Sequence, residues 1–143
     1  MNSRKAILAP IRRLFSAMEK GDSSMLRQVF HPSVRLLTVT LDASGRAVLR
    51  SGEEVSAFAR SIAAYGPGVL QEPIYRVRVR RYGPYAEVVA HYAFFFKGKF
   101  HHCGIDSFQL MKTDDGWCVV GLTDTRQKEG CRVPGRIRRN PGG

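Results

Sequence analysis

The sequence is poor in the residues from which metal and redox sites are built. Its 143 residues include three cysteines, Cys103, Cys118 and Cys131, and their spacing matches no metal-binding motif. An odd number of cysteines without such spacing leads us to expect reduced thiols and a cytoplasmic protein. The sequence therefore predicts neither a metal site nor a bound cofactor.

Acidic residues are also scarce, since 12 Asp and Glu stand against 23 Lys and Arg, which gives a net charge of +11. Much of this excess lies in residues 126–143, where six basic residues accompany one acidic residue, Glu129. A segment so rich in Gly, Pro and Arg has too few apolar side chains to build a core. We therefore expect one domain over residues 1–128, followed by a disordered basic tail over residues 129–143.

Long apolar segments are absent as well. No apolar run approaches the roughly 20 residues that a helix needs to cross a bilayer, so we expect no membrane-spanning segment. The basic N-terminus is a poor secretory signal because Arg12 and Arg13 interrupt its apolar stretch. The N-terminus has no acidic residue before Glu19, which is also typical of mitochondrial presequences. We do not predict a presequence, because the same residues are needed for the first helix of the domain.

The apolar periodicity predicts three helices, with a hairpin between the second and third, followed by an antiparallel meander. Ser51–Glu54 has the pattern of a capping box that starts the third helix, and beyond Pro67 the period changes to two, as in strands. Helices in one half and most strands in the other predict an α+β fold. The predicted helices cover about residues 5–20, 23–30 and 52–65, and the strands 34–41, 47–49, 74–82, 85–96, 99–112 and 117–125.

Residues 94–124 carry the clearest pattern, with one hairpin turning at Lys97-Gly98 and another at Asp114-Asp115-Gly116. A two-residue first turn would place His91 opposite Gly104. His91, His102, Gly104 and Asp106 would then share one face of the sheet, because side chains alternate and paired residues point the same way. The second turn would place Thr123 opposite Asp106, and Gly104 would leave room for a ligand.

Several segments resemble one known superfamily. The Gly21-Asp22 junction, Phe30-His31-Pro32, FKGKFHHCGIDSFQL (96–110) and TDDGWCVVGLTDTR (113–126) are similar to the putative lumazine-binding branch of the nuclear-transport-factor-2-like (SnoaL-like) superfamily. The resemblance covers about residues 5–128. It implies a cone-shaped α+β fold, in which three helices pack on a curved, mixed and mostly antiparallel sheet around a pocket. It also implies a homodimer formed through the sheet.

The chemistry expected on the predicted face is acid–base chemistry. His102 and Asp106 are the candidate acid–base pair, and His91 would orient or assist them. Alternatively, aromatic neighbours would desolvate Asp106 and let it donate a proton, or both side chains would simply satisfy each other inside a core. The residues expected to line the pocket are His31, Phe15, Phe95, Phe108, Trp117 and Thr123.

The sequence thus predicts a protein that binds a small molecule of unknown identity, and leaves open whether it is an enzyme of the cyclase, isomerase or dehydratase type. The alternative is a non-catalytic dimerisation or adaptor module. A third hypothesis is that Arg76, Arg78 and Arg80, which alternate along one strand, bind a polyanion. No nucleic-acid-binding motif accompanies them, so a solvated outer face is the expected role of these arginines.

Overall fold

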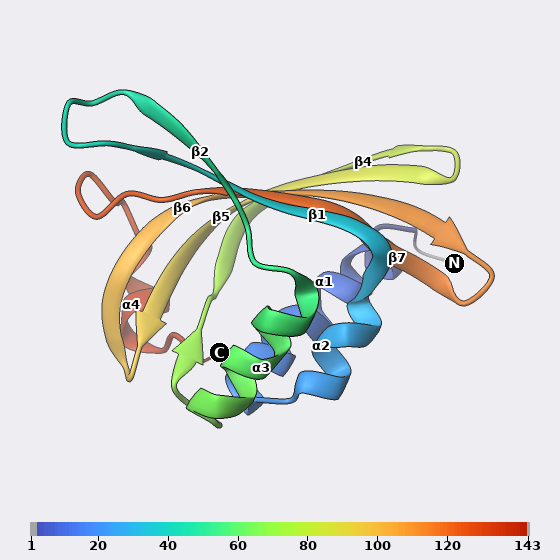
Figure 1. Ribbon diagram of the computed structural model, residues 1–143, viewed down its shortest axis with the longest axis horizontal. Coiled ribbons are helices and arrows are strands. Elements are labelled where there is room, and N and C mark those ends of the chain that lie inside the picture. Colours follow the sequence, from blue (N-terminus) through green and yellow to red (C-terminus); the bar gives the residue numbers. More distant parts are fainter. Residues whose placement is uncertain (1–2, 143) are drawn as a thin grey trace.

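The computed structural model describes residues 3–142, so Met1, Asn2 and Gly143, at the ends of the predicted domain and tail, lie outside the described residues. Three helices lie on one face of a curved sheet, and a short fourth helix lies at one end of it (Figure 1). The predicted α+β cone is confirmed. The elements are α1 (Ser3–Lys20), α2 (Ser23–Val29), β1 (Phe30–Leu41), β2 (Ala47–Ser51), α3 (Val55–Tyr65), β3 (Leu70–Gln71), β4 (Ile74–Tyr82), β5 (Tyr85–Phe96), β6 (Lys99–Thr113), β7 (Gly116–Thr125) and α4 (Gly135–Arg139).

The helices begin and end close to their predicted positions, with one correction. Asp22 caps α2, because its carboxylate accepts a hydrogen bond of 3.0 Å from the backbone N–H of Met25. The predicted capping box is wrong: Ser51 is the last residue of β2, and α3 starts after Glu54 without a side-chain cap. Pro10 lies in the interior of α1, and its side chain is buried.

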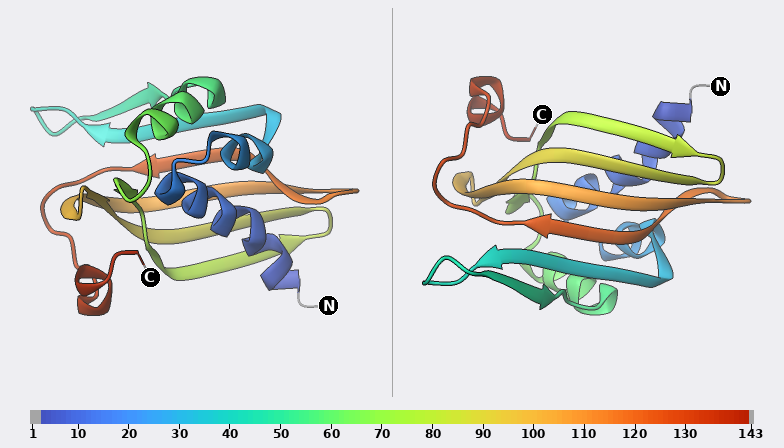
Figure 2. Two further views of the ribbon diagram at one scale, coloured as in Figure 1. Left: turned by 90° about the horizontal axis from the view of Figure 1, so that it is seen from below. Right: turned by 90° about the horizontal axis from the view of Figure 1, so that it is seen from above.

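The strands form one mixed sheet in the order β2-β1-β7-β6-β5-β3, and β4 also pairs with β5. β1 and β7 are parallel, whereas the other pairs are antiparallel. Helices α1–α3 cover the inner face of the sheet, and Figure 2 shows this layer from below and the outer face, on which these three helices do not lie, from above. The main core lies between them, around buried side chains such as Ile11, Leu26, Ile62, Phe108 and Val119.

The β5–β6 hairpin turns where predicted, but its register changes one pair later. Lys97 and Gly98 both have positive φ, 52° and 79°, as a two-residue hairpin turn requires, and Phe96 pairs with Lys99. A bulge follows, because Phe95 pairs with Phe100 while Phe94 pairs with His102. One extra residue on one strand moves every later side chain of that strand to the other face.

The C-terminal tail is ordered over its described residues, contrary to our expectation. Cys131 forms a disulfide with Cys103 of β6, so the prediction of three reduced thiols is also wrong. Further along, Ile137 of α4 is buried against Tyr75, Ala93 and Phe95 on the outer face.

No helix in residues 3–142 is long and apolar enough to cross a membrane.

Candidate functional site

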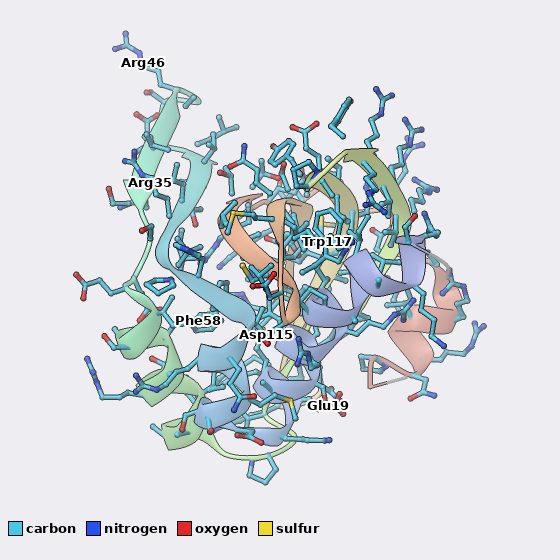
Figure 3. The ribbon with its side chains drawn as sticks, turned by 90° about the vertical axis from the view of Figure 1, so that its right-hand side faces the viewer. Glu19, Arg35, Arg46, Phe58, Asp115 and Trp117 are labelled. Atoms are coloured by element: carbon cyan, nitrogen blue, oxygen red, sulfur yellow. A yellow bond between two sulfur atoms is a disulfide. The ribbon has the colours of Figure 1, made fainter. Side chains whose placement is uncertain are left out.

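A cavity of about 520 Å³ opens between the helices and the inner face of the sheet. It lies where α1 and α3 approach β1, β2, the middle of β6 and the last residues of β7. Figure 3 shows Phe58 of α3 between the helix layer and the β1–β2 hairpin, whose tip carries Arg46. The apolar walls are made mainly by Leu14, Phe15, Met18, Leu36, Phe58 and Leu122, and the polar lining by Thr38, Arg50, Glu53, Glu72, Asp106, Asp124 and Arg126.

Two carboxyl groups, Asp106 of β6 and Glu72 of the β3–β4 connection, meet in this cavity. Asp106 is 3% exposed, and burial raises its pKa to about 7, assisted by the nearby charge of Asp124. Burial and then the charge of Asp106 raise the pKa of Glu72 well above its ordinary value. Oδ2 of Asp106 has no donor among the described residues if both groups are ionised, whereas a shared proton allows a hydrogen bond between them. The pair therefore retains a proton near neutral pH.

Asp124 lies opposite Asp106 on β7 and is held by several donors. The Thr38 hydroxyl donates to its Oδ1, and Nε of Arg126 donates to its Oδ2 at 3.0 Å. The Tyr92 hydroxyl lies 3.4 Å from the same Oδ2 and donates to the backbone carbonyl of Thr125. Burial, followed by the charge of Glu72, raises the pKa of the Tyr92 phenol, so the phenol stays protonated.

His102 faces inward but does not reach Asp106. The two residues are four positions apart on one strand, so their backbones are separated by about 13 Å. The imidazole of His102 packs 4.9 Å from the Phe94 ring and 5.6 Å from the Tyr92 ring, and its Nδ1 lies 2.8 Å from Nδ1 of His101. Burial, and next the Arg126 charge, lower its pKa to about 4, so the ring is neutral. The structure does not bring together the predicted acid–base pair.

The register predicted for His91 and Thr123 is wrong. Because of the bulge near the turn, His91 pairs with Ile105 on the outer face, where it stacks on Tyr75 at 5.5 Å. A second bulge, between Gln109 and Leu110, pairs Asp106 with Asp124 and sends Thr123 to the outer face as well.

The aromatic residues predicted to line the pocket are divided among different places. Phe15 lines the cavity. Phe108 is fully buried behind Phe15, and the two rings lie edge to face with their centroids 6.2 Å apart. Phe95 lies on the outer face beneath α4. Trp117 lies near the start of β7, where the centroid of its ring is 5.4 Å from the Arg81 guanidinium. Neither Phe95 nor Trp117 lines the cavity.

Two other predicted features also lie outside the cavity lining. His31 is at the start of β1, where its Nδ1 accepts a hydrogen bond of 3.0 Å from the Ser33 N–H. Gly104 leaves no room for a ligand, because the Thr125 carbonyl occupies the space that a side chain would need. The glycine instead allows the end of β7 to approach β6.

The three arginines of β4 do not form the even row that alternation predicts. A bulge between Tyr75 and Arg78 places Arg76 at a positive φ of 50°, with its guanidinium 6.0 Å from the Tyr75 ring. Arg78 and Arg80 follow on the outer face, where Arg80 pairs with the acidic Glu87.

Sequence reasoning missed Glu72, Tyr92, Asp124 and Arg126. The predicted register places His91 and Thr123 on the face of Asp106 and therefore their neighbours Tyr92 and Asp124 on the opposite face. This is wrong because each bulge shifts the pairing by one residue. Glu72 lies in a short connection between β3 and β4 and belongs to no periodic pattern. The signal that could have found it is its neighbour Pro73, which marks a break in the chain before a long strand.

A second pocket of about 620 Å³ adjoins the first and shares Phe15 and Glu72 with it. Its walls are α1 on one side and the C-terminal tail on the other, through Arg136, Ile137 and Asn140. Among residues 3–142, no group of three His, Cys, Asp or Glu side chains is arranged to hold a metal ion.

Comparison with known proteins agrees with this architecture. A family profile described as putative lumazine-binding matches residues 2–123. The chain belongs to this putative lumazine-binding family. Among curated proteins, none matches the chain.

Solved structures similar to this chain share its fold. A nuclear-transport-factor-2-like protein of unknown function from Shewanella baltica is 16% identical, with a TM-score of 0.64 over 89% of this chain and 95% of that one. A protein of unknown function from Mycobacterium tuberculosis is 12% identical, with a TM-score of 0.67 over 97% and 86%. A putative dehydratase from Streptomyces avermitilis is 16% identical, with a TM-score of 0.60 over 87% and 95%. At these identities the likeness establishes the nuclear-transport-factor-2-like fold alone.

Proposed function

We propose that this protein binds a small organic molecule in the 520 Å³ cavity and transfers protons to and from it through Asp106 and Glu72. The observation that carries the proposal is the carboxyl pair at the cavity wall, formed by buried Asp106 and half-buried Glu72. Both pKa values are raised, and one oxygen of Asp106 lacks a donor when both groups are ionised. Such a site is expensive to bury and is typical of functional carboxyl groups.

The pair can act as an acid and a base in one step. The carboxyl group that holds the proton donates it to a carbonyl or a departing hydroxyl of the ligand, and the ionised partner accepts a proton from a neighbouring carbon. One proton enters the ligand and one leaves it, so the charge of the pair is restored. This is the proton balance of isomerases and dehydratases, and the putative dehydratase among the structural neighbours supports that choice.

Of the three residues predicted as catalytic, this proposal keeps Asp106. His91 lies on the outer face, and His102 is packed against aromatic rings outside the cavity lining. Tyr92, Thr38 and Arg126 are positioning residues in the proposal, because they fix Asp124, whose charge helps to raise the pKa of Asp106.

Binding is tested by thermal shift with lumazine, riboflavin and a panel of cyclic ketones and hydroxy acids. A ligand that binds only the folded state raises the melting temperature, and we expect at least one class to do so. For each ligand that binds, deuterium incorporation from D₂O is then followed by NMR. We expect Asp106→Asn to slow this exchange by about 100-fold. Flat melting curves throughout, or exchange that Asp106→Asn leaves unchanged, would contradict the proposal.

We also propose a homodimer formed through the outer face of the sheet, the feature on which the adaptor alternative depends. Val89 and Met111 lie on this face and are 40% and 37% exposed, beyond the part that the tail covers. Sedimentation equilibrium should give the mass of two chains, and Val89→Glu with Met111→Glu should give the mass of one. Asp114→Lys at a hairpin tip is the control. A monomeric wild-type protein would remove the dimer proposal.

A further inference from the structure

Two exposed arginines line the cavity beside Thr38 and mark its outer end: Arg50 on β2 and Arg126 just after the end of β7. Thr38 of β1 pairs with Arg50 of β2 on one side and with Asp124 of β7 on the other. Arg126, two residues beyond Asp124, projects to the same side of its strand. Both guanidiniums line the cavity, and the Arg126 side chain remains 55% exposed although its Nε is bonded to Asp124.

The charges of the cavity are unevenly distributed along its length. At the inner end, the raised pKa values of Asp106 and Glu72 mean that the pair keeps a proton near neutral pH. At the outer end, Arg126 is matched by Asp124, and Arg50 stands near one exposed acidic side chain, Glu53. The apolar side chains Phe15, Leu36, Phe58 and Leu122 line the same cavity.

We propose that the ligand of this cavity is an amphipathic carboxylate: an apolar body, a polar oxygen at its inner end, and a carboxylate at its outer end. The carboxylate contacts Arg50 and the terminal nitrogens of Arg126. The inner oxygen belongs to a hydroxyl that donates to Oδ2 of Asp106, an atom without a hydrogen-bond partner among the described residues. This inference deepens the proposed function, since it names the class of molecule on which the carboxyl pair would act.

Physical chemistry favours a carboxylate at this place. A guanidinium presents its donors in a planar fork that matches a carboxylate, and charge-assisted hydrogen bonds are about twice as strong as neutral ones. Asp124 takes Nε of Arg126 and so orients its remaining donors. At the inner end, a second negative charge would be repelled by Asp106 and Glu72, so the ligand enters with its carboxylate toward the arginines.

The test uses matched pairs of probes measured by isothermal titration calorimetry at low salt. One pair is 6-hydroxy-2-naphthoate and its neutral amide, and further pairs of aryl and alicyclic hydroxy acids with their amides vary the size of the body. We expect at least one acid to bind about tenfold more tightly than its amide, as one charge-assisted hydrogen bond provides. The preference should weaken as salt is raised.

Variants locate the effect at the outer end of the cavity. Arg50→Gln and Arg126→Gln should each remove most of the preference for the acid, while Arg126→Lys should keep part of it. Glu53→Gln should strengthen acid binding several-fold, because it removes an opposing charge. The control is Arg46→Gln, at the exposed tip of the same β1–β2 hairpin, which lies outside the cavity lining.

The outcomes separate this inference from the proposed function. Equal binding of acids and amides, or an acid preference that survives both Arg50→Gln and Arg126→Gln, overturns the amphipathic carboxylate. So does stabilisation by neutral or cationic ligands alone, although the proposed function would then stand. If no small molecule stabilises the protein, both proposals fall.

Discussion

The two faces of strands β5 and β6 differ in how their buried groups are satisfied. On the inner face, Asp106 and Tyr92 are buried beside a cavity, and one carboxylate oxygen lacks a donor when the pair is ionised. On the outer face near the same strands, Ala93 and Phe95 are covered by the tail, which is fixed by a disulfide.

The difference shows where the chain accepts an energetic cost. The outer cluster is apolar and closed, so each contact adds to stability. The inner cluster buries titratable groups, which lowers stability unless a proton or a ligand compensates them. Alternating side chains of the same two strands therefore serve opposite purposes, and the following substitutions test that division.

The largest effect is expected on the inner face from Gly104→Ala. The added methyl group would collide with the backbone carbonyl of Thr125, which cannot rotate away. We expect the free energy of unfolding in urea to fall by at least about 4 kcal/mol, at the upper end for single substitutions. Gly135→Ala in α4 is the control, because there the methyl group meets only the flexible end of Arg139. A loss below about 1 kcal/mol would show that β7 can move away from β6.

On the outer face, Cys131→Ser tests the attachment of the tail. The disulfide closes a loop with a sequence separation of 28 residues, for which the chain-entropy estimate is a loss of about 3.5 kcal/mol in the unfolding free energy. Hydrogen exchange should also accelerate in α4. Cys118→Ser, which removes the free cysteine, is the matched control. Equal stability of Cys131→Ser and wild type would mean that Ile137 alone holds the tail.

Asp106→Asn should have a smaller effect that depends on pH. The pKa of Asp106 is raised in the folded protein to about 7 from 3.8. The folded state therefore binds more protons than the unfolded state between these values, and stability decreases as pH rises through that range. The contribution is fully present below pH 3.8 and is lost above pH 7.

Because an amide does not ionise, Asp106→Asn should flatten this dependence. At pH 8 the variant should be more stable than wild type by about 1–3 kcal/mol, a range that allows for its coupling to Glu72. Urea unfolding at pH 5 and pH 8 measures the difference, with Asp114→Asn in an exposed turn as the control. A parallel loss of stability at both pH values would contradict a raised pKa.

The sequence predicted the fold more fully than the site. The turn at Lys97-Gly98 is decided by neighbours in the chain, and it is confirmed. Asp106 was predicted from the same local pattern and does line the cavity. Its partner Glu72 could not be predicted, because it is brought to Asp106 by the path of a connection that has no repeat.

The sequence by itself determined the order of α1–α3 and the long strands, the α+β class and the positions of the long hairpins, because periodicity and turn residues act over a few residues. It did not indicate β3 or α4. The tertiary structure decided which side chains share the inner face. Because of two bulges, Tyr92 and Asp124 lie on the inner face, where His91 and Thr123 were predicted. A bulge depends on how two strands fit across the whole sheet. It also decided the place of the tail, since Ile137 and Cys131 find their partners only on the assembled outer face.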